Sequence, residues 1–221
     1  MLYSKKSNFA FFLCHSNANH SICMALHTIM DKKTDISWDW LNKSNYGFKH
    51  VSPGGYLETD DFNFKNMISS EEWKKISKIT TVRNPWSRMY DFYTWHFTMK
   101  KSPYKKIEKI IYDYTLSKPS FDEWIKNLEI DRSLKWWDQI FNQKVYRKDC
   151  NFVLRYENLN EDFKKIFPNL KIPSSNVSHP NQWFVDDDKY QMNEYSMNLI
   201  KKYCYDDIVE FDYVYEGKII G

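Results

Sequence analysis

Residues 81–93, TVRNPWSRMYDFY, decide the fold of this chain. They begin within an apolar run, Ile79 to Val82, which predicts a buried β-strand. An Arg-Asn-Pro corner follows at Arg83, and a helix is predicted from Pro85, because the N–H that proline lacks would be unpaired in a first helical turn anyway. This order places an arginine and backbone N–H groups at the end of a strand. The stretch therefore predicts an anion site, since phosphate binds readily at such a corner.

Short apolar runs and helical patterns alternate on both sides of this stretch. Residues 9–14 form a continuous apolar run, as expected of a central parallel strand, and residues 151–156 form the next strand. Helices are predicted at residues 21–30, from an N-cap at Ser70, within 104–141 with a capping box of Ser120 and Glu123, after Glu157, and at 194–205. The alternation predicts an α/β fold, a central parallel sheet flanked by helices, in a single domain over residues 1–221.

Composition limits the classes of function. Hydrophobic residues make up 42% of the 221 residues and charged residues 28%, which predicts a packed globular protein. A net charge of +3 is too small to attract nucleic acid by bulk charge. The apolar run from Phe9 to Cys14 is too short for a membrane span, and no small-residue cleavage site follows it. We therefore expect a cytoplasmic protein without a signal peptide, a membrane span or a nucleic-acid partner.

The four cysteines, Cys14, Cys23, Cys150 and Cys204, are widely and irregularly spaced. They match neither a zinc template nor a dense disulfide framework. We expect reduced, buried thiols and no metal site.

The stretch after Val82 resembles the nucleotide 3′-phosphate-binding signature of sulfotransferases. Arg83, Pro85, Arg88 and Tyr93 fit that signature, whereas Asp91 stands at its serine position. Arg88 and Tyr93 fit a structural role as well as a functional one.

The order of segments resembles the carbohydrate-type sulfotransferases over about residues 8–215. A Tyr-Glu-Asn-Leu run at residues 156–159 follows the second strand, and residues 206–213, DDIVEFDY, are similar to the ending of that family. The resemblance implies a P-loop-like sulfotransferase architecture and PAPS (3′-phosphoadenosine 5′-phosphosulfate) as the donor.

The resemblance also implies that the first loop holds the 5′-phosphosulfate. The loop residues are Ser16, Asn17, Ala18, Asn19, His20 and Ser21. Ser16 stands at the family's lysine position and Asn19 at its glycine position, while Ala18 and Ser21 match. The Gly-Lys-Ser/Thr motif of P-loop ATPases is missing, which disfavours a small kinase.

Arg83 and Asp91 are the residues expected at the 3′-phosphate. A carboxylate about 4 Å from a phosphate would cost roughly 4 kcal/mol at an effective dielectric constant near 20. Asp91 therefore points away, a cation lies between the two, or the ligand is a different molecule. His50, at a strand end before a glycine turn, is the expected general base. The alternative is that His50 is a solvent-facing or hydrogen-bonded loop residue without a catalytic role.

Two functions follow from these patterns. The first is transfer of a sulfuryl group from PAPS to a hydroxyl or amine of a small-molecule or carbohydrate acceptor. The alternative is a catalytically inactive sulfotransferase-like protein that binds another anion or a protein partner. Neither the individual acceptor nor the oligomeric state can be read from the sequence.

Overall fold

The computed structural model of this chain describes residues 2–14, 17–31, 69–98, 119–130, 141–173 and 191–219. They belong to two compact units. Unit 1 comprises Met1–Val82 and Lys144–Pro180, and unit 2 comprises Arg83–Gln143 and Asn181–Gly221. That the whole chain forms a single domain stays a prediction.

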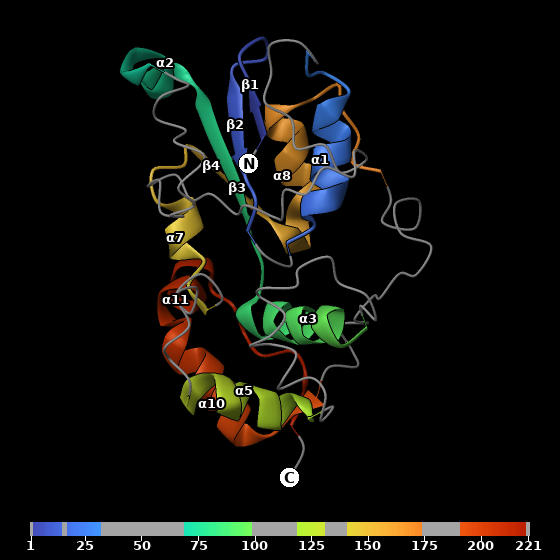
Figure 1. The fold of residues 1–221 in the computed structure, drawn as a ribbon, viewed down its shortest axis with the longest axis vertical. Coiled ribbons are helices and arrows are strands. Elements are labelled where there is room, and N and C mark those ends of the chain that lie inside the picture. The colour runs from blue at the N-terminus through green and yellow to red at the C-terminus, as the bar shows by residue number, and fades with distance from the viewer. Residues whose placement is uncertain are drawn as a thin grey trace. The chain divides into compact units, whose positions relative to one another are not determined.

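Unit 1 contains a four-stranded sheet in the order β1-β2-β3-β4 (Figure 1). The strands are β1 (Leu2–Ser4), β2 (Phe9–Phe12), β3 (Ser77–Val82) and β4 (Phe152–Arg155). The strands β2, β3 and β4 run parallel, whereas β1 pairs antiparallel with β2 at the edge. The predicted α/β fold is confirmed, and β1 is an addition, because three residues are too few to show an alternating pattern.

Both faces of the sheet in unit 1 are covered. The helices α1 (Asn19–His27) and α8 (Leu159–Ile166) lie on one face (Figure 1), where Phe9 and Phe11 belong to a buried cluster. The residues of β2 that alternate with Phe9 and Phe11 point to the opposite face of the sheet, where Phe12 packs edge-on against Trp73. Two covered faces explain why β2 is a continuous apolar run.

The helix α2 (Ser70–Lys75) in unit 1 begins one residue earlier than predicted. Its N-cap is Ser69, not Ser70, and a reciprocal capping box joins Ser69 to Glu72. The Ser69 hydroxyl accepts from the N–H of Glu72 at 3.2 Å, and Glu72 Oε2 accepts from the N–H of Ser69 at 3.2 Å. The prediction was wrong because only Ser69 has a glutamate three residues later.

Unit 2 is mainly helical, with α3 (Pro85–Thr98), α5 (Phe121–Ile130), α10 (Glu194–Tyr203) and α11 (Tyr205–Phe211). Two short parallel strands accompany them, β5 (Gln191–Met192) and β6 (Lys218–Ile219). The α3 start at Pro85 and the Ser120–Glu123 capping box before α5 are confirmed. The helix predicted over 194–205 ends at Tyr203, and α11 continues after Cys204.

Large aromatic side chains build the core of unit 2, as the composition predicts. The cluster joins α3, α5, α10 and α11 through Trp86, Phe92, Phe121, Trp124 and Phe141, with Met89, Leu199 and Ile200.

The remaining short elements belong to unit 1 and are the helix α7 (Lys144–Arg147) and the 3-10 turn η2 (Tyr156–Asn158). Among the described helices, none is long and apolar enough to cross a membrane.

Candidate functional site

The first loop in unit 1 leads from β2 to α1. Ala18 is the last residue before α1 and has the left-handed backbone conformation, with φ of 56°. Few residues other than glycine adopt this conformation, and alanine has no side-chain oxygen to cap a helix. The first turn of α1 carries no acidic residue. The loop therefore ends at a helix N-terminus whose dipole favours a negatively charged ligand.

Two asparagine side chains hold the shape of this loop. Asn17 is buried, and its Nδ2 donates to the carbonyl oxygen of Thr81 in β3 at 3.0 Å. Asn19 Nδ2 donates to the carbonyl oxygen of Cys14, which closes the loop on itself. Both residues were predicted to bind the donor, and the structure gives their amide groups these main-chain partners.

Two predicted site residues, Ser16 and His50, lie outside the described part of the chain, so the structure leaves the lysine-position residue and the expected base untested. His20 lies in the first turn of α1, where only its backbone is described, and Ser21 is buried beside it.

Arg83 opens unit 2, directly after the last residue of β3 in the chain. Its side chain is 4% exposed, and Nε donates to the hydroxyl of Ser87 at 3.1 Å. Its Nη1 lies 3.5 Å from Oδ2 of Asp91, whose side chain is 25% exposed. The structure thus brings together the two residues expected at the 3′-phosphate. Asp91 is turned toward Arg83, and the cation beside this carboxylate is Arg83 itself.

Gln143 clamps the backbone of Arg83. Its Oε1 accepts from the N–H of Arg83 at 2.9 Å, and its Nε2 donates to the carbonyl oxygen of Arg83 at 2.8 Å. The backbone N–H of Gln143 in turn donates to Oδ2 of Asp207 at 3.0 Å. Gln143 is not among the predicted site residues, because nothing near it in the chain marks a partner 60 residues away. Asp207 was included in the family-like ending, residues 206–213, without a role.

The next residue, Asn84, fixes the start of α3. Its Oδ1 accepts from the N–H of Trp86 at 3.2 Å, and its Nδ2 donates to the carbonyl oxygen of Val214 at 2.8 Å. This side chain thus joins the corner to the C-terminal segment of unit 2. The Arg-Asn-Pro corner is therefore bonded to Gln143 through the Arg83 backbone and to Val214 through the Asn84 side chain.

Arg88 and Tyr93 support the core of unit 2. Arg88 is 1% exposed, and the Tyr93 hydroxyl donates to the carbonyl oxygen of Pro119 at 2.8 Å. The Tyr93 ring packs against Phe121 and Trp124. Burial raises the pKa of Tyr93 above its ordinary value, so its hydroxyl is neutral near pH 7.

Burial makes three of the four thiols, those of Cys23, Cys150 and Cys204, weak nucleophiles. Burial raises the pKa of Cys23, Cys150 and Cys204 to about 12 each, which keeps them protonated at neutral pH. All four cysteines lie in described residues, and none forms a disulfide. Cys150 is only partly buried, and the other three are buried as predicted.

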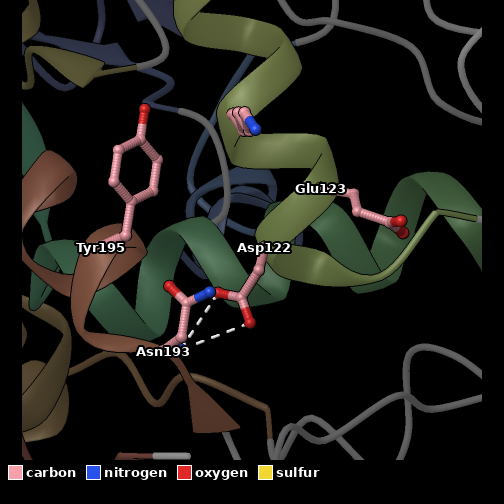
Figure 2. Close-up of a pocket in the computed structure, with 5 residues that line it drawn as sticks. Asp122, Glu123, Asn193 and Tyr195 are labelled. Carbon is pink, nitrogen blue, oxygen red and sulfur yellow. Dashed lines mark hydrogen bonds between the residues drawn. The ribbon is translucent and has the colours of Figure 1, made fainter. Parts of the chain in front are cut away.

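A pocket of about 230 Å³ in unit 2 contains none of the predicted site residues. It is lined by Asp122, Glu123, Lys126, Asn193 and Tyr195. Figure 2 shows Asp122 pointing toward Asn193, while Glu123 and Tyr195 point elsewhere. The backbone N–H of Asn193 donates a hydrogen bond to Oδ1 of Asp122 at 3.1 Å. Glu123 caps α5, and the Tyr195 hydroxyl donates to Glu129. Because Asp122, Glu123 and Tyr195 already bond other groups of unit 2, we do not take this pocket as the candidate site.

Comparison with known protein families identifies a match for this chain. The model of the sulfotransferase family matches residues 7–214, which cover both units. No curated protein and no solved structure matches the chain significantly. The matched residues include the first loop, the clamped Arg83 corner and the Asp207 segment. On this match over nearly its whole length, the chain belongs to the sulfotransferase family.

Proposed function

We propose that this chain transfers a sulfuryl group from PAPS to a hydroxyl or amine of a small-molecule or carbohydrate acceptor. The observation that carries the proposal is the Arg83 corner. Arg83 directly follows a parallel strand, its backbone is fixed by Gln143, and it meets Asp91, the residue at the other 3′-phosphate position. Such a fixed cation suits a ligand that must be held in one orientation.

The donor's two ends require two sets of residues. The backbone N–H groups of residues 17–21 and the dipole of α1 bind the 5′-phosphosulfate. The N-terminus of α1 supports this role, because its N-cap is Ala18 and its first turn has no carboxylate. Ser16 takes the place of the lysine that the family has there, so the backbone carries the larger share of this contact. Arg83 binds the 3′ side of the nucleotide.

The chemistry is an in-line displacement at sulfur. An acceptor oxygen or nitrogen forms a bond to sulfur while the bond from sulfur to the phosphate oxygen breaks, and PAP (adenosine 3′,5′-bisphosphate) leaves. The acceptor's proton passes to a general base, for which we propose His50. In the described residues, the buried thiols are protonated and unsuited to a covalent intermediate.

The Arg83–Asp91 ion pair favours a second candidate function. A carboxylate that already pairs with the expected phosphate ligand would also suit an inactive family member. Such a protein would bind another anion or a protein partner instead of turning over PAPS.

The test is transfer from labelled PAPS to pooled sugars, alcohols and amines, with wild type and His50→Ala. We expect transfer by wild type, and a loss of roughly 10²–10⁴ in turnover for His50→Ala, with PAP affinity nearly unchanged. The matched control is His27→Ala, at an exposed position in the last turn of α1, which should keep wild-type turnover. A loss of only a few-fold in His50→Ala would remove His50 as the base. Absence of transfer to every pool would favour the inactive alternative.

A further inference from the structure

Asp91 bears on which nucleotide this corner accepts. Its carboxylate lies 3.5 Å from Nη1 of Arg83, the group expected to bind a 3′-phosphate. A phosphate monoester carries a charge of about −1.5 to −2 at pH 7, so it would meet Asp91 as a like charge. The ion pair also offsets the positive charge of Arg83. Both effects act against a 3′-phosphate.

The corner has little freedom to avoid this conflict by moving Arg83. The guanidinium is buried and bonded to Ser87, and Gln143 holds both backbone groups of Arg83. To admit a phosphate on the Asp91 side, Asp91 would have to leave its cation. A ligand that binds at this corner of unit 2 therefore contacts Asp91 while Asp91 is paired with Arg83.

Asp91 suits a hydroxyl group instead. A carboxylate only accepts hydrogen bonds, whereas the serine expected at this position can donate one. Dinucleotide sites use the same distinction on the ribose, where an acidic residue binds a hydroxyl and an arginine accommodates a phosphate. A ribose with an unsubstituted 3′-hydroxyl can donate to Asp91 without disturbing the ion pair.

We propose that Asp91 is a specificity-determining residue that makes this chain accept adenosine nucleotides with an unsubstituted 3′-hydroxyl at least as well as those with a 3′-phosphate. The proposal rests on the proposed function, because it assumes an adenosine-nucleotide sulfuryl donor. The donor class then includes adenosine 5′-phosphosulfate. The same sulfur–oxygen bond to the phosphate breaks, the acceptor's proton goes to the base, and AMP leaves in place of PAP.

The experiment measures the dissociation constants of AMP and PAP by calorimetry at about 0.15 M salt, where longer-range charge effects are screened. Wild type should bind AMP as tightly as PAP or more tightly. Asp91→Ser should shift the ratio of the two affinities toward PAP by about tenfold or more, because it removes the like charge and supplies a donor. Asp91→Asn removes the charge but keeps the shape, and it should shift the ratio in the same direction. The control Asp212→Asn, at an exposed left-handed position in the same unit, should leave the ratio unchanged.

The outcomes separate this inference from the proposed function. Wild type that binds PAP about tenfold or more tightly than AMP would overturn the inference and leave the proposed function standing. Equal binding with no shift in either Asp91 variant would overturn the role of Asp91. Absence of binding of both nucleotides at millimolar concentration would overturn both proposals. The ratio of the AMP and PAP affinities of wild type tests the inference even where a variant fails to fold.

Discussion

Arg83 is nearly fully buried, and a buried guanidinium is stable only when its charge and its N–H groups have partners. Asp91 supplies the charge and Ser87 an acceptor for Nε. The sequence predicted the strand-end position of Arg83 from the Arg-Asn-Pro corner. It placed Asp91 at the same site but did not predict that Asp91 pairs with Arg83 or that Gln143 bonds the Arg83 backbone, because these contacts depend on how the chain folds after Val82. A carboxylate that looked unfavourable for the site is thus part of its structure.

Gln143 offers a test of this corner at the level of one side chain. Replacing it by leucine leaves the buried N–H and carbonyl oxygen of Arg83 without their partner at Gln143. We expect Gln143→Leu to lower the free energy of unfolding by about 2–4 kcal/mol, from two lost buried hydrogen bonds at about 1–2 kcal/mol each. Chemical denaturation measures this change.

The matched control for this substitution is Gln191→Leu, at an exposed position in β5 of the same unit. It should change the free energy of unfolding by less than about 0.5 kcal/mol. A Gln143→Leu protein as stable as the control would contradict the clamp.

At the scale of elements, the predictions that succeeded rest on local signals. The Ser120–Glu123 box and the Pro85 helix start are each set by residues within one turn. The edge strand β1 was missed because it is short and gains its place by pairing with β2. The helix α11 was not predicted, because the predicted helix ended at Tyr205 and the residues that follow were matched only to the family's ending. Tertiary pairing, not local preference, decides such cases.

The capping box of α2 gives a pH-dependent prediction. A hydrogen bond from Lys5, followed by those from the N–H and hydroxyl of Ser69, lowers the pKa of Glu72 to about 2. Because the pKa is lower in the folded state, Glu72 stabilises the fold above its unfolded pKa of about 4.3, and this stabilisation is lost as the pH falls toward 2. Glu72→Gln should therefore unfold at a lower temperature than wild type at pH 7. The difference should shrink between about pH 4.5 and about pH 2.

Thermal unfolding over this pH range measures the Glu72 effect. Glu71→Gln is the matched control, because it removes a carboxylate from the same first turn without altering the Ser69 box. Its difference from wild type at pH 7 should be smaller than that of Glu72→Gln. A Glu72→Gln difference that stays constant down to pH 2 would show that the charge of Glu72 plays no part.

At the scale of the whole molecule, membership of the sulfotransferase family rests on a match that covers residues of both units. The family match begins before β2 and ends after α11, so it includes the sheet of unit 1 and the helices of unit 2. The sequence predicted the order of segments from alternating strands and helices and from two short motifs. It could not predict the acceptor, since acceptor recognition depends on loops whose residues follow no fixed pattern.

The central claim is that this chain still binds a donor nucleotide, and calorimetric titration of the whole protein with PAP and AMP tests it most directly. We predict saturable binding of at least one nucleotide to wild type with a dissociation constant below about 1 mM, a binding free energy of about −4 kcal/mol or better. Arg83→Ala should weaken PAP binding about tenfold or more, because charged hydrogen bonds contribute about 1.5–3 kcal/mol each. Circular dichroism must show that the variant remains folded. Absence of heat with both nucleotides at millimolar concentration would contradict the claim, whereas an unchanged PAP affinity in folded Arg83→Ala protein would remove Arg83 from the binding site.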